Sequence, residues 1–584
     1  MKRRAVQKPA ISKWRYCVIM SVLVLFPVFA VWHIAGLQVL PNEERGFEFL
    51  QNQGDARTVR IESLPAYRGV ITDRRGEPLA VSTPMVSLWA NPKVLVESRE
   101  NTLRLADSLG MDGNELLERV ERLQQREFMY LRRNMTPSAA ADILDQGIAG
   151  VYSRREFQRF YPAAEVTSHL LGFTNVDDRG QEGLELAYEQ WLQGVPGARR
   201  VLKDRKGRII KDLELVRSEQ PGGDMALSID LRLQYIAYRE LKEAVDQFQA
   251  AAGSMVVLDV RTGEVLAMVN QPSFNPNGRR QAEPADMRNR AVIDQLEPGS
   301  TMKPFTVVAG LEQGVIALGQ DIDTSPGWMQ VGRKTIRDHS NYGVVDLGTM
   351  LAKSSNVGTV RIAQAMAPED MREIYDRVGL GRSTGIGFPG EMPGVLPDKR
   401  RWSAIEIANL SFGHGLATTP LQIAHAYSVL ANDGEKKPVS LIRRDGAPAG
   451  EQLIDPHIAR SVRQMMTGAV ERGGTATRAA VPGYSVAGKT GTVHKVGPQG
   501  YERDRYMGVF AGIIPATDPR LVAVVVIDDP RGGVYYGGAV AAPVFANVMS
   551  EALRLLAIPP EESIEEPLPA HLVDSAVSAA EDRS

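Results

Sequence analysis

The 584-residue sequence has a single cysteine, Cys17, so no disulfide can form within the chain. Its eight histidines form neither an H-E-x-x-H motif nor a cluster with cysteine, which argues against a metal site. Neither charge is in large excess, with 68 Lys and Arg against 70 Asp and Glu, so nothing predicts nucleic-acid binding. The length of 584 residues is enough for two or more domains. Because the metal-binding patterns are absent, we expect no metal and no cofactor.

Charged residues are also absent from residues 16 to 40. In a helix these residues rise about 37 Å, enough to cross a bilayer core of about 30 Å. Residues 1 to 15 carry six basic residues and no acid, which predicts that this end stays in the cytoplasm. A cleaved signal peptide is the alternative, because Val28-Phe29-Ala30 could be a peptidase site. The apolar run continues ten residues past Ala30, which favours a retained transmembrane anchor.

The rest of the chain shows two segments and a tail. Residues 41 to 225 alternate short β-branched runs with charged helical patterns, among them a broken helix over 102 to 124. Residues 226 to 558 predict helices and hairpins in the order of an α+β domain, an antiparallel sheet flanked by helices. Its expected elements are a helix over 231 to 250, a hairpin over 254 to 270, a hairpin of 506 to 515 with 521 to 529, and a helix over 542 to 558. Residues 559 to 584 hold seven acids and four prolines, which predicts a disordered tail.

The residues Gly-Lys-Thr at 488 to 490 fit two incompatible motifs. With Gly483 they match G-x-x-x-x-G-K-[ST], a phosphate-binding loop, which requires a strand before it and a helix after it. As Lys489-Thr490-Gly491 they match K-T-G, a motif of penicillin-recognising serine enzymes. The flanking residues are rich in Gly, Pro and β-branched side chains, which predicts strands and turns. The sequence therefore favours the K-T-G interpretation.

The segment EPGSTMKPF contains the only S-x-x-K of the chain, formed by Ser300 and Lys303. On a helix, positions i and i+3 share a face, so the hydroxyl and the amine can meet. Pro298 and Gly299 break the chain before this segment and Pro304 fits a first turn, so we expect a helix to begin at Ser300. Taken alone, a capping serine and a solvated lysine explain the segment as well.

Two more motifs follow in order. The segment AKSSNVGT supplies Ser354 and Asn356 as S-x-N, 54 residues after Ser300, and Lys489 begins K-T-G 135 residues later. Alone, S-x-N also fits a helix N-cap, because NVGTVRIAQAM continues as a helix. Three motifs in this order are far more specific than any one of them.

The chemistry of the set is that of an activated serine. The hydroxyl of Ser300 is a weak nucleophile until a neighbouring base accepts its proton. Lys303 is the candidate base if burial and a second cation, Lys489, lower its pKa. Ser354 can pass the proton from Ser300 to the leaving amine.

The other motif residues are candidates for substrate binding. Asn356 offers an amide to the substrate backbone, and Gly491 lets a peptide lie along the strand as an added strand. Thr490 and Thr492 offer hydroxyls to a carboxylate. The backbone N–H groups of Ser300 and Thr492 are candidates for an oxyanion hole.

With these motifs, the chain resembles the class B penicillin-binding proteins, the peptidoglycan DD-transpeptidases of bacteria. The segments RGVITDRRGEPLA, RREFQRFYP and GQEGLELAYE are similar to the pedestal motifs of that family. The segments LSFGHGLATTPLQIA and YYGGAVAAPVF are similar to its transpeptidase domain. The last segment and the overall length are most similar to the septal type, penicillin-binding protein 3 of Gram-negative bacteria.

The resemblance implies a fold, a location and partners. It implies a penicillin-binding, serine β-lactamase-like transpeptidase domain (226 to 558) on an elongated pedestal (41 to 225), with one transmembrane helix (16 to 40) after a cytoplasmic tail (1 to 15). The catalytic domain would lie in the periplasm, anchored in the inner membrane. The substrates would be peptidoglycan stem peptides, β-lactams would acylate the same serine, and a membrane glycosyltransferase of the divisome and other division proteins would be partners.

Three other interpretations stay open. One of them, a non-catalytic scaffold, would be expected to have lost Ser300 or a lysine, and this sequence keeps them. An elongation-type transpeptidase would use the same chemistry, and a serine β-lactamase or β-lactam sensor would share the motifs. A class A β-lactamase requires a carboxylate that holds water against the ester. The nearest candidate is Glu406 in EIAN, but Asn409 follows it by three residues where those enzymes have four, which rotates the amide by about 100°. We therefore expect Glu406 to be a structural or capping residue.

Overall fold

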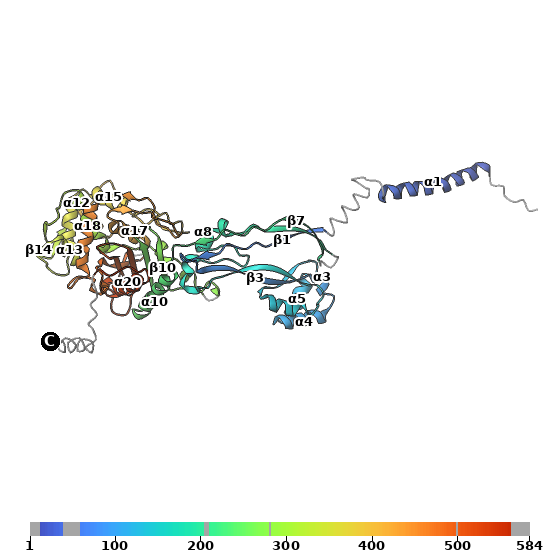
Figure 1. Ribbon diagram of the computed structural model, residues 1–584, viewed down its shortest axis with the longest axis horizontal. Helices are drawn as coiled ribbons and strands as arrows, with labels where there is room; N and C mark the ends of the chain where they lie inside the picture. The colour runs from blue at the N-terminus through green and yellow to red at the C-terminus, as the bar shows by residue number, and fades with distance from the viewer. Residues whose placement is uncertain (1–11, 39–58, 204–208, 280–281, 498–499, 562–584) are drawn as a thin grey trace, which may run out of the picture. The chain divides into compact units, whose positions relative to one another are not determined.

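The structure of the protein is a computed structural model (Figure 1). It describes residues 12–38, 59–203, 209–279, 282–497 and 500–561. The chain divides into two compact units. The smaller unit comprises residues 1–67, 84–157 and 194–221, and the larger unit comprises residues 68–83, 158–193 and 222–584. The sequence places the boundary between the pedestal domain and the transpeptidase domain after residue 225, and this boundary stays a prediction.

The N-terminal helix α1 (Lys13–Gln38) is the candidate membrane anchor. Its stretch Lys13–Ala35 has a mean hydropathy of 2.4 and is long and apolar enough to cross a membrane. The last two residues of the predicted span, 39 and 40, lie outside the described residues, as do residues 1–11 of the basic tail and residues 562–584 of the acidic tail.

The smaller unit contains a three-stranded antiparallel sheet, in which β6 (Gly197–Lys203) lies between β1 (Val59–Leu64) and β7 (Ile209–Arg217). It also contains most of β3 (Pro78–Ala90), with β4 (Met129–Met135) and most of β5 (Val151–Phe160) paired to it. Besides α1, its described helices are α3 (Pro92–Leu95), α4 (Arg99–Leu109), α5 (Gly113–Arg122) and α6 (Pro137–Leu144). The predicted broken helix is confirmed: α4 ends at Gly110, which has a φ of 63°, and Asp112 caps α5.

The larger unit is built on a five-stranded antiparallel sheet with the order β10-β9-β19-β18-β17. The strands are β9 (Ala252–Asp259), β10 (Val265–Gln271), β17 (Ala487–Gly497), β18 (Gly500–Ile514) and β19 (Leu521–Asp528). Both predicted hairpins are present, β9–β10 and β18–β19. The strand β17, which carries the K-T-G motif, lies at an edge of the sheet, so its outer edge is open to a further strand.

The sheet separates two hydrophobic cores. Along β19, Val522 and Val524 belong to one core, whereas Ala523 and Val525 belong to the other, as expected from the alternation of side chains on a strand. The helices α10 (Leu231–Gln247) and α20 (Ala542–Leu555) cover the second face, and Figure 1 shows the two helices beside each other. The helices α12 (Lys303–Glu312) and α17 (Pro420–Ala431) contribute to the first core, so the predicted α+β architecture is confirmed.

The remaining elements of the larger unit lie before the sheet and between β10 and the C-terminus. Those before the sheet are β2 (Ile71–Thr72), η1 (Ala164–Val166), α7 (Ser168–Leu171), α8 (Gly183–Ala187), α9 (Glu189–Leu192) and β8 (Met225–Ala226). Those that follow are η3 (Pro284–Met287), α11 (Arg290–Ile293), η4 (Gly299–Met302), β11 (Asp321–Asp323), β12 (Trp328–Val331), β13 (Lys334–Arg337), β14 (Val344–Asp346), α13 (Leu347–Ala352), α14 (Asn356–Gln364), α15 (Pro368–Arg377), α16 (Ala404–Ser411), β15 (Glu435–Lys436), β16 (Glu451–Gln452), α18 (Pro456–Met465), η5 (Met466–Ala469), η6 (Thr477–Ala479) and α19 (Gly537–Val540).

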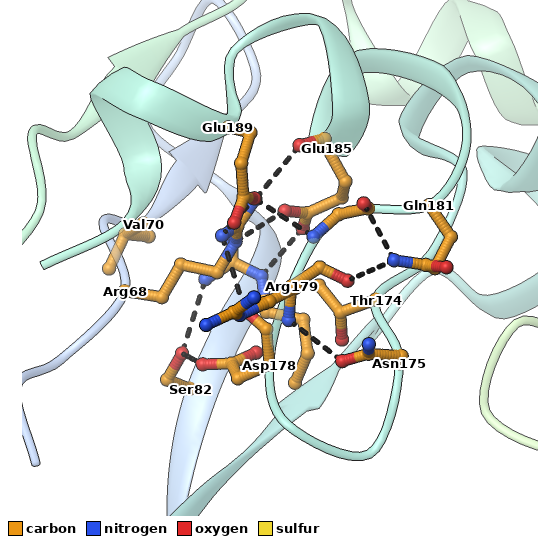
Figure 2. Close-up of polar contacts among 12 residues, drawn as sticks. Arg68, Val70, Ser82, Thr174, Asn175, Asp178, Arg179, Gln181, Glu185 and Glu189 are labelled. Carbon is orange, nitrogen blue, oxygen red and sulfur yellow. Dashed lines mark hydrogen bonds and ion pairs between the residues drawn. The ribbon is translucent and has the colours of Figure 1, made fainter.

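A group of buried charges lies among the early segments of the larger unit (Figure 2). The two oxygens of Glu185 accept hydrogen bonds from the Nε atoms of Arg68 and Arg159, each at 2.6 Å. Arg68 also contacts Glu189 at 2.6 Å and donates to the carbonyl of Asp178 at 3.2 Å. We call these five residues the paired cluster. The side chains of Arg68, Arg159 and Glu185 are each at most 1% exposed, yet every one has a partner of opposite charge.

Candidate active site

Ser300 lies in the 3₁₀ turn η4, and the α-helix α12 begins only at Lys303. The prediction that the helix begins at Ser300 is therefore wrong by three residues, because the tighter turn precedes it. Gly299 has a φ of 57°, and a Cβ there would lie 2.5 Å from Cγ1 of Val493, so only glycine fits this position. Ser300 is half-buried, and its hydroxyl makes no hydrogen bond with any residue that the structure describes.

Lys303 is completely buried, and its amine points to the second motif. The Nζ atom donates hydrogen bonds to the carbonyl oxygen of Ser354 at 2.6 Å, to Oδ1 of Asn356 at 2.7 Å and to Oγ of Ser354 at 3.1 Å. An ammonium group has three donors, so these contacts satisfy all of them. The structure thus brings the first and second motifs together through the lysine, whereas no hydrogen bond joins Lys303 to Ser300 among the described residues.

Ser354 occupies the centre of the site. Its hydroxyl accepts from both lysines, from Lys303 at 3.1 Å and from Lys489 at 2.8 Å. Its φ of 57° is unusual for a residue with a Cβ, a form of strain that concentrates at functional sites. The cap of α14 is Ser355, whose hydroxyl accepts from the N–H of Gly358 at 2.9 Å. The Ser354 hydroxyl is therefore left to the lysines.

Asp338 holds the S-x-N segment in place. Its carboxylate accepts from the hydroxyl of Ser355 and from the backbone N–H groups of Asn356 and Val357. The side-chain amide of Asn356 donates to the carbonyl of Arg337 at 2.9 Å, which leaves its second N–H for another acceptor. Sequence reasoning missed Asp338, because a carboxylate that caps a segment 17 or more residues away leaves no local pattern.

The K-T-G motif lies within β17, which approaches η4 closely. A Cβ at Gly491 would lie 2.9 Å from the carbonyl oxygen of Pro298 and 3.3 Å from Cγ2 of Thr301. A glycine here therefore lets the strand pack against the turn that carries Ser300. Because residues 488–490 lie near the start of β17, and β17 is followed by another strand, β18, the phosphate-loop interpretation is excluded.

Burial and mutual repulsion lower the pKa values of the two lysines. Burial is the main cause for Lys303, and the positive charge of Lys489 adds to it, so the pKa of Lys303 lies well below its usual range. Asp338 opposes this shift in the Lys303 pKa. Burial lowers the pKa of Lys489 to about 7. Two cations that share one hydroxyl, both 0% exposed, favour loss of a proton from one of them.

The hydroxyls of Thr490 and Thr492 lie on the same strand as Lys489. Oγ1 of Thr490 donates to Oγ1 of Thr475 at 3.1 Å, and Oγ1 of Thr492 accepts from the N–H of Gly537 at 3.0 Å. Sequence reasoning missed Thr475 and Gly537. A Cβ at Gly537 would lie 2.4 Å from the carbonyl of Gly491, so the strand and α19 could not approach each other with any other residue there.

Glu406 is a helix-capping residue, as predicted. Its carboxylate accepts from the backbone N–H and the hydroxyl of Ser403 at the start of α16, at 2.9 and 2.7 Å, and it also contacts Lys399. Lys399 and Ser403 lower the pKa of Glu406 to about 2. Among the described residues, no group of three or more His, Cys, Asp and Glu side chains could hold a metal ion.

Comparisons with known proteins agree with this geometry. The chain matches the family described as penicillin-binding protein transpeptidase domain over residues 253–550, and the family described as penicillin-binding protein dimerisation domain over residues 63–227. It is 41% identical to the probable peptidoglycan D,D-transpeptidase PbpC of Pseudomonas aeruginosa, over 95% of this chain and 97% of that protein. It is also 41% identical to the peptidoglycan D,D-transpeptidase FtsI of Escherichia coli K12, over 94% and 93% of the two chains.

A solved structure extends the likeness to the fold. Penicillin-binding protein 3 of Mycobacterium tuberculosis, complexed with aztreonam, superposes with a TM-score of 0.67 at 27% identity, over 86% of this chain and 98% of that one. The transpeptidase match covers the five-stranded sheet, except the first residue of β9, and most of α20, and so includes all three motifs. With its S-x-x-K turn, its S-x-N segment and its K-T-G edge strand in contact, the chain belongs to the penicillin-binding protein transpeptidase family.

Proposed function

We propose that this protein is a peptidoglycan D,D-transpeptidase of septal cell-wall synthesis and a target of β-lactams. One observation carries the proposal: two fully buried lysines meet at the hydroxyl of Ser354 beside the turn that holds Ser300. Burying two like charges costs stability, so the arrangement calls for a chemical role. Acyl transfer through a serine is the chemistry that such a site supports.

In the first half-reaction, Ser300 is the nucleophile and Lys303 the base. The Oγ of Ser300 attacks the carbonyl of the penultimate D-Ala of a stem peptide, and its proton passes to the neutral amine of Lys303. The peptide C–N bond breaks, and the terminal D-Ala leaves as an amine that receives a proton through Ser354. Lys489 stays positive and stabilises the negative charge that develops. The product is an ester on Ser300.

In the second half-reaction, an amine of a neighbouring stem peptide attacks the ester. Its proton passes back through Ser354 and Lys303, the ester C–O bond breaks, and Ser300 regains its hydrogen. The new bond is an amide, which cross-links the two peptides without a cofactor or an energy source. A β-lactam forms the same ester, but its leaving group remains tethered.

The remaining motif residues bind the substrate in this proposal. The second N–H of Asn356 donates to a substrate carbonyl, and the free edge of β17 at Gly491 pairs with the peptide backbone. Thr490 and Thr492, with Lys489 behind them, hold the terminal carboxylate. The N–H groups of Ser300 and Thr492 form the oxyanion hole.

The location and partners follow from the same proposal. The helix α1 is a retained anchor in the inner membrane, and the catalytic domain lies in the periplasm because the basic residues precede the helix. A division-specific membrane glycosyltransferase supplies the glycan strands, and other division proteins bind the same complex. A reporter that is active only outside the cytoplasm, fused after residue 225, should be active, whereas a mature protein beginning at Val31 would establish cleavage instead.

The test is the fate of the acyl group. Purified full-length protein in detergent receives a D-Ala-D-Ala stem peptide and an amine acceptor. We expect D-Ala and a new amide in equal amounts, and neither from Ser300→Ala. Hydrolysis of the donor with no amide at any acceptor concentration would contradict the transpeptidase function.

The pair of buried lysines, Lys303 and Lys489, which we call the lysine site, does not by itself distinguish a transpeptidase from a β-lactamase. Glu406 provides the distinction. In class A β-lactamases a carboxylate activates the water that removes the acyl group. Here Glu406 is occupied by Ser403 and Lys399 at the start of α16. This capping role supports slow hydrolysis of the ester and favours the transpeptidase.

A further inference from the structure

A polar pocket of about 360 Å³ lies between the helix α13 and the turn η5 with the loop that follows it, and we call it the α13 pocket. Its lining residues belong to the segments 346–353 and 464–474. They include Lys353, which directly precedes Ser354, and Gly474, which directly precedes Thr475. Consecutive Cα atoms are about 3.8 Å apart, so the pocket begins beside the shared hydroxyl of the lysine site and beside the partner of Thr490.

Two cations line the α13 pocket without an acidic partner. Lys353 is half-buried, and its Nζ atom donates to the neutral carbonyl of Gly473 at 2.7 Å. Arg472 is exposed and makes no hydrogen bond or ion pair with any residue that the structure describes. An ammonium group has three donors and a guanidinium group has five, so most of these donors are available to a ligand. Both groups form their strongest hydrogen bonds with carboxylates.

The acidic side chains of the pocket are engaged locally. Asp346 caps α13, because its two oxygens accept from the N–H and the hydroxyl of Thr349 at 2.8 and 2.9 Å. Glu471 accepts from the hydroxyl of Thr467 at 3.3 Å. The charged groups whose bonding capacity is least used are therefore positive, and the pocket favours a ligand that carries a carboxylate.

The direction of the substrate decides which peptide reaches this end of the site. In the proposed function, the terminal carboxylate of the donor lies at Thr490 and the attacked carbonyl at Ser300. The leaving D-Ala therefore lies at the end of the site where Thr490 contacts Thr475. After it has left, the acceptor amine must approach the same ester carbon, so it takes the place of the amine that departed. The body of the acceptor then extends beyond Thr490, away from the donor.

We propose that the α13 pocket binds the acceptor stem peptide through a carboxylate that lies a few bonds beyond the position of the leaving D-Ala. The inference rests on the proposed function, which supplies the ester and the direction of attack. Five single bonds of about 1.5 Å span roughly 6 Å, enough to pass from Thr490 beyond Thr475 into the pocket. Lys353 and Arg472 hold the carboxylate there with charge-assisted hydrogen bonds. The pocket selects acceptors and takes no part in the recognition of donors.

The experiment measures transfer from one donor, an N-acyl-D-alanyl thioester, to three acceptors. The acceptors are D-amino acids with the same seven-carbon chain, which ends in a carboxylate, a methyl group or an amine. Full-length protein in detergent turns over the donor at an acceptor concentration low enough that most acyl groups are hydrolysed. Mass spectrometry then counts the new amide per thiol released.

We expect the acceptor that ends in a carboxylate to give about tenfold more amide than the acceptor that ends in a methyl group, corresponding to about 1.4 kcal/mol. The acceptor that ends in an amine should give the least, because its charge repels the two cations. A ratio near one between the carboxylate and methyl acceptors would overturn the inference. So would an amine acceptor that reacts as well as the carboxylate acceptor.

Charge variants assign the preference to the pocket. Arg472→Gln should lower the carboxylate-to-methyl ratio to between one and three, and Arg472→Glu should make the amine acceptor better than the carboxylate acceptor. The matched control is Arg478→Glu, at an exposed arginine that does not line the pocket and makes no ion pair with a described residue, and it should keep the full ratio. Because amide is counted per thiol released, a slower first half-reaction does not change the ratio. A preference that persists in Arg472→Glu, or one that Arg478→Glu loses equally, would overturn the inference.

The two proposals fail in different ways. If the protein releases no thiol from the donor, or releases thiol without forming an amide with any acceptor, the proposed function is wrong. If amide forms but the three acceptors give equal amounts of it, only the inference about the α13 pocket is wrong.

Discussion

The larger unit contains two groups of buried charges that differ in one respect. In the paired cluster, Arg68 and Arg159 share the carboxylate of Glu185, so each of these three charges has an opposite partner. In the lysine site, Lys303 and Lys489 are equally buried, yet they share only a neutral hydroxyl. The paired charges join segments of the chain, whereas burial lowers the pKa values of both lysines, and in the proposed function Lys303 is the one that acts as a base.

The comparison shows why burial by itself does not identify a site. Glu185 connects residues that are 117 and 26 positions away in the sequence, so its removal would leave Arg159 without its partner and Arg68 with Glu189 alone. Removal of Lys303 would instead relieve repulsion with Lys489. The two groups should therefore respond in opposite ways to the same kind of substitution, one in stability and the other in reactivity.

The largest expected effect is in the lysine site. Lys303→Met should reduce the rate of acylation by penicillin about 10³-fold, because a positioned base contributes about 10² to 10⁴. It should leave the melting temperature unchanged or higher, since one of two like charges is gone. Stopped-flow or gel-based labelling gives the rate, and Lys211→Met, an exposed lysine of β7, is the matched control. If Lys303→Met protein unfolds, or if penicillin labels it at the normal rate, the proposed difference between the lysine site and the paired cluster is contradicted.

The second effect is in the paired cluster. Glu185→Ala should lower the free energy of unfolding by about 3–5 kcal/mol, because it leaves the buried Arg159 without its partner and removes one of the two carboxylates that pair with Arg68. Glu189→Ala should cost less, since its side chain is 23% exposed. Thermal unfolding of the full chain in detergent measures both. Folded Glu185→Ala protein should still be acylated, so a loss of acylation without a loss of stability would contradict the structural role.

The third effect separates the charge of Lys489 from its shape. Lys489→Ala should slow acylation about 10²-fold, because the developing negative charge loses its nearest cation. Lys489→Arg keeps the charge and should retain about tenfold more activity than the alanine variant. Equal losses in the two variants would count against an electrostatic role for Lys489.

The fourth effect is the pH dependence of acylation. The neutral form of Lys303 is the reactive one, so the rate should rise with pH through its lowered pKa. Lys489 must stay protonated, and its pKa of about 7 predicts that the rate falls again above about pH 7. Lys489→Arg keeps its proton at all these values, so its alkaline limb should be shifted upward or lost. A profile with the same alkaline limb in both proteins would assign that limb to another group.

The smallest effect is at Asp178, at the margin of the paired cluster. Burial raises its pKa from 3.8 to about 6, against the opposing effects of Arg159 and Arg68. The folded state therefore binds this proton more tightly than the unfolded state, and its contribution to stability is lost as the pH rises from about 4 to 6. Asp178→Asn should remove that slope and stabilise the protein at pH 7 by about 1 kcal/mol. Unfolding curves at pH 4 and 7 test this, and an unchanged slope would contradict it.

The sequence predicts the lysine site well and the paired cluster poorly, for a physical reason. Ser300, Lys303, Ser354 and Lys489 occur in short motifs whose residue types the chemistry requires, so their order is informative even without a structure. The sheet and its hairpins also follow from local alternation and turns. In contrast, Arg68 and Glu185 lie in two family motifs that are 117 positions apart, and neither motif by itself indicates that the two side chains pair.

The same limit applies within the site. Nothing in the sequence indicates that Asp338 holds the S-x-N segment or that Gly537 supports Thr492, because both contacts join elements that are distant along the chain. The start of α12 was misplaced because the turn η4 depends on the left-handed Gly299 and its contact with Val493, a residue of another element. The motifs predict which residues lie together, and tertiary contacts decide how those residues are held.

The central claim is that the buried lysines activate Ser300 for acylation and that no group in the site removes the acyl group quickly. The most direct test acylates purified full-length protein with penicillin, removes the free drug, follows the adduct by intact mass and maps it by peptide analysis. We expect one adduct, on the peptide that contains Ser300, that persists for many minutes or longer. An adduct on another peptide, or release within seconds with steady turnover of drug, would contradict the account.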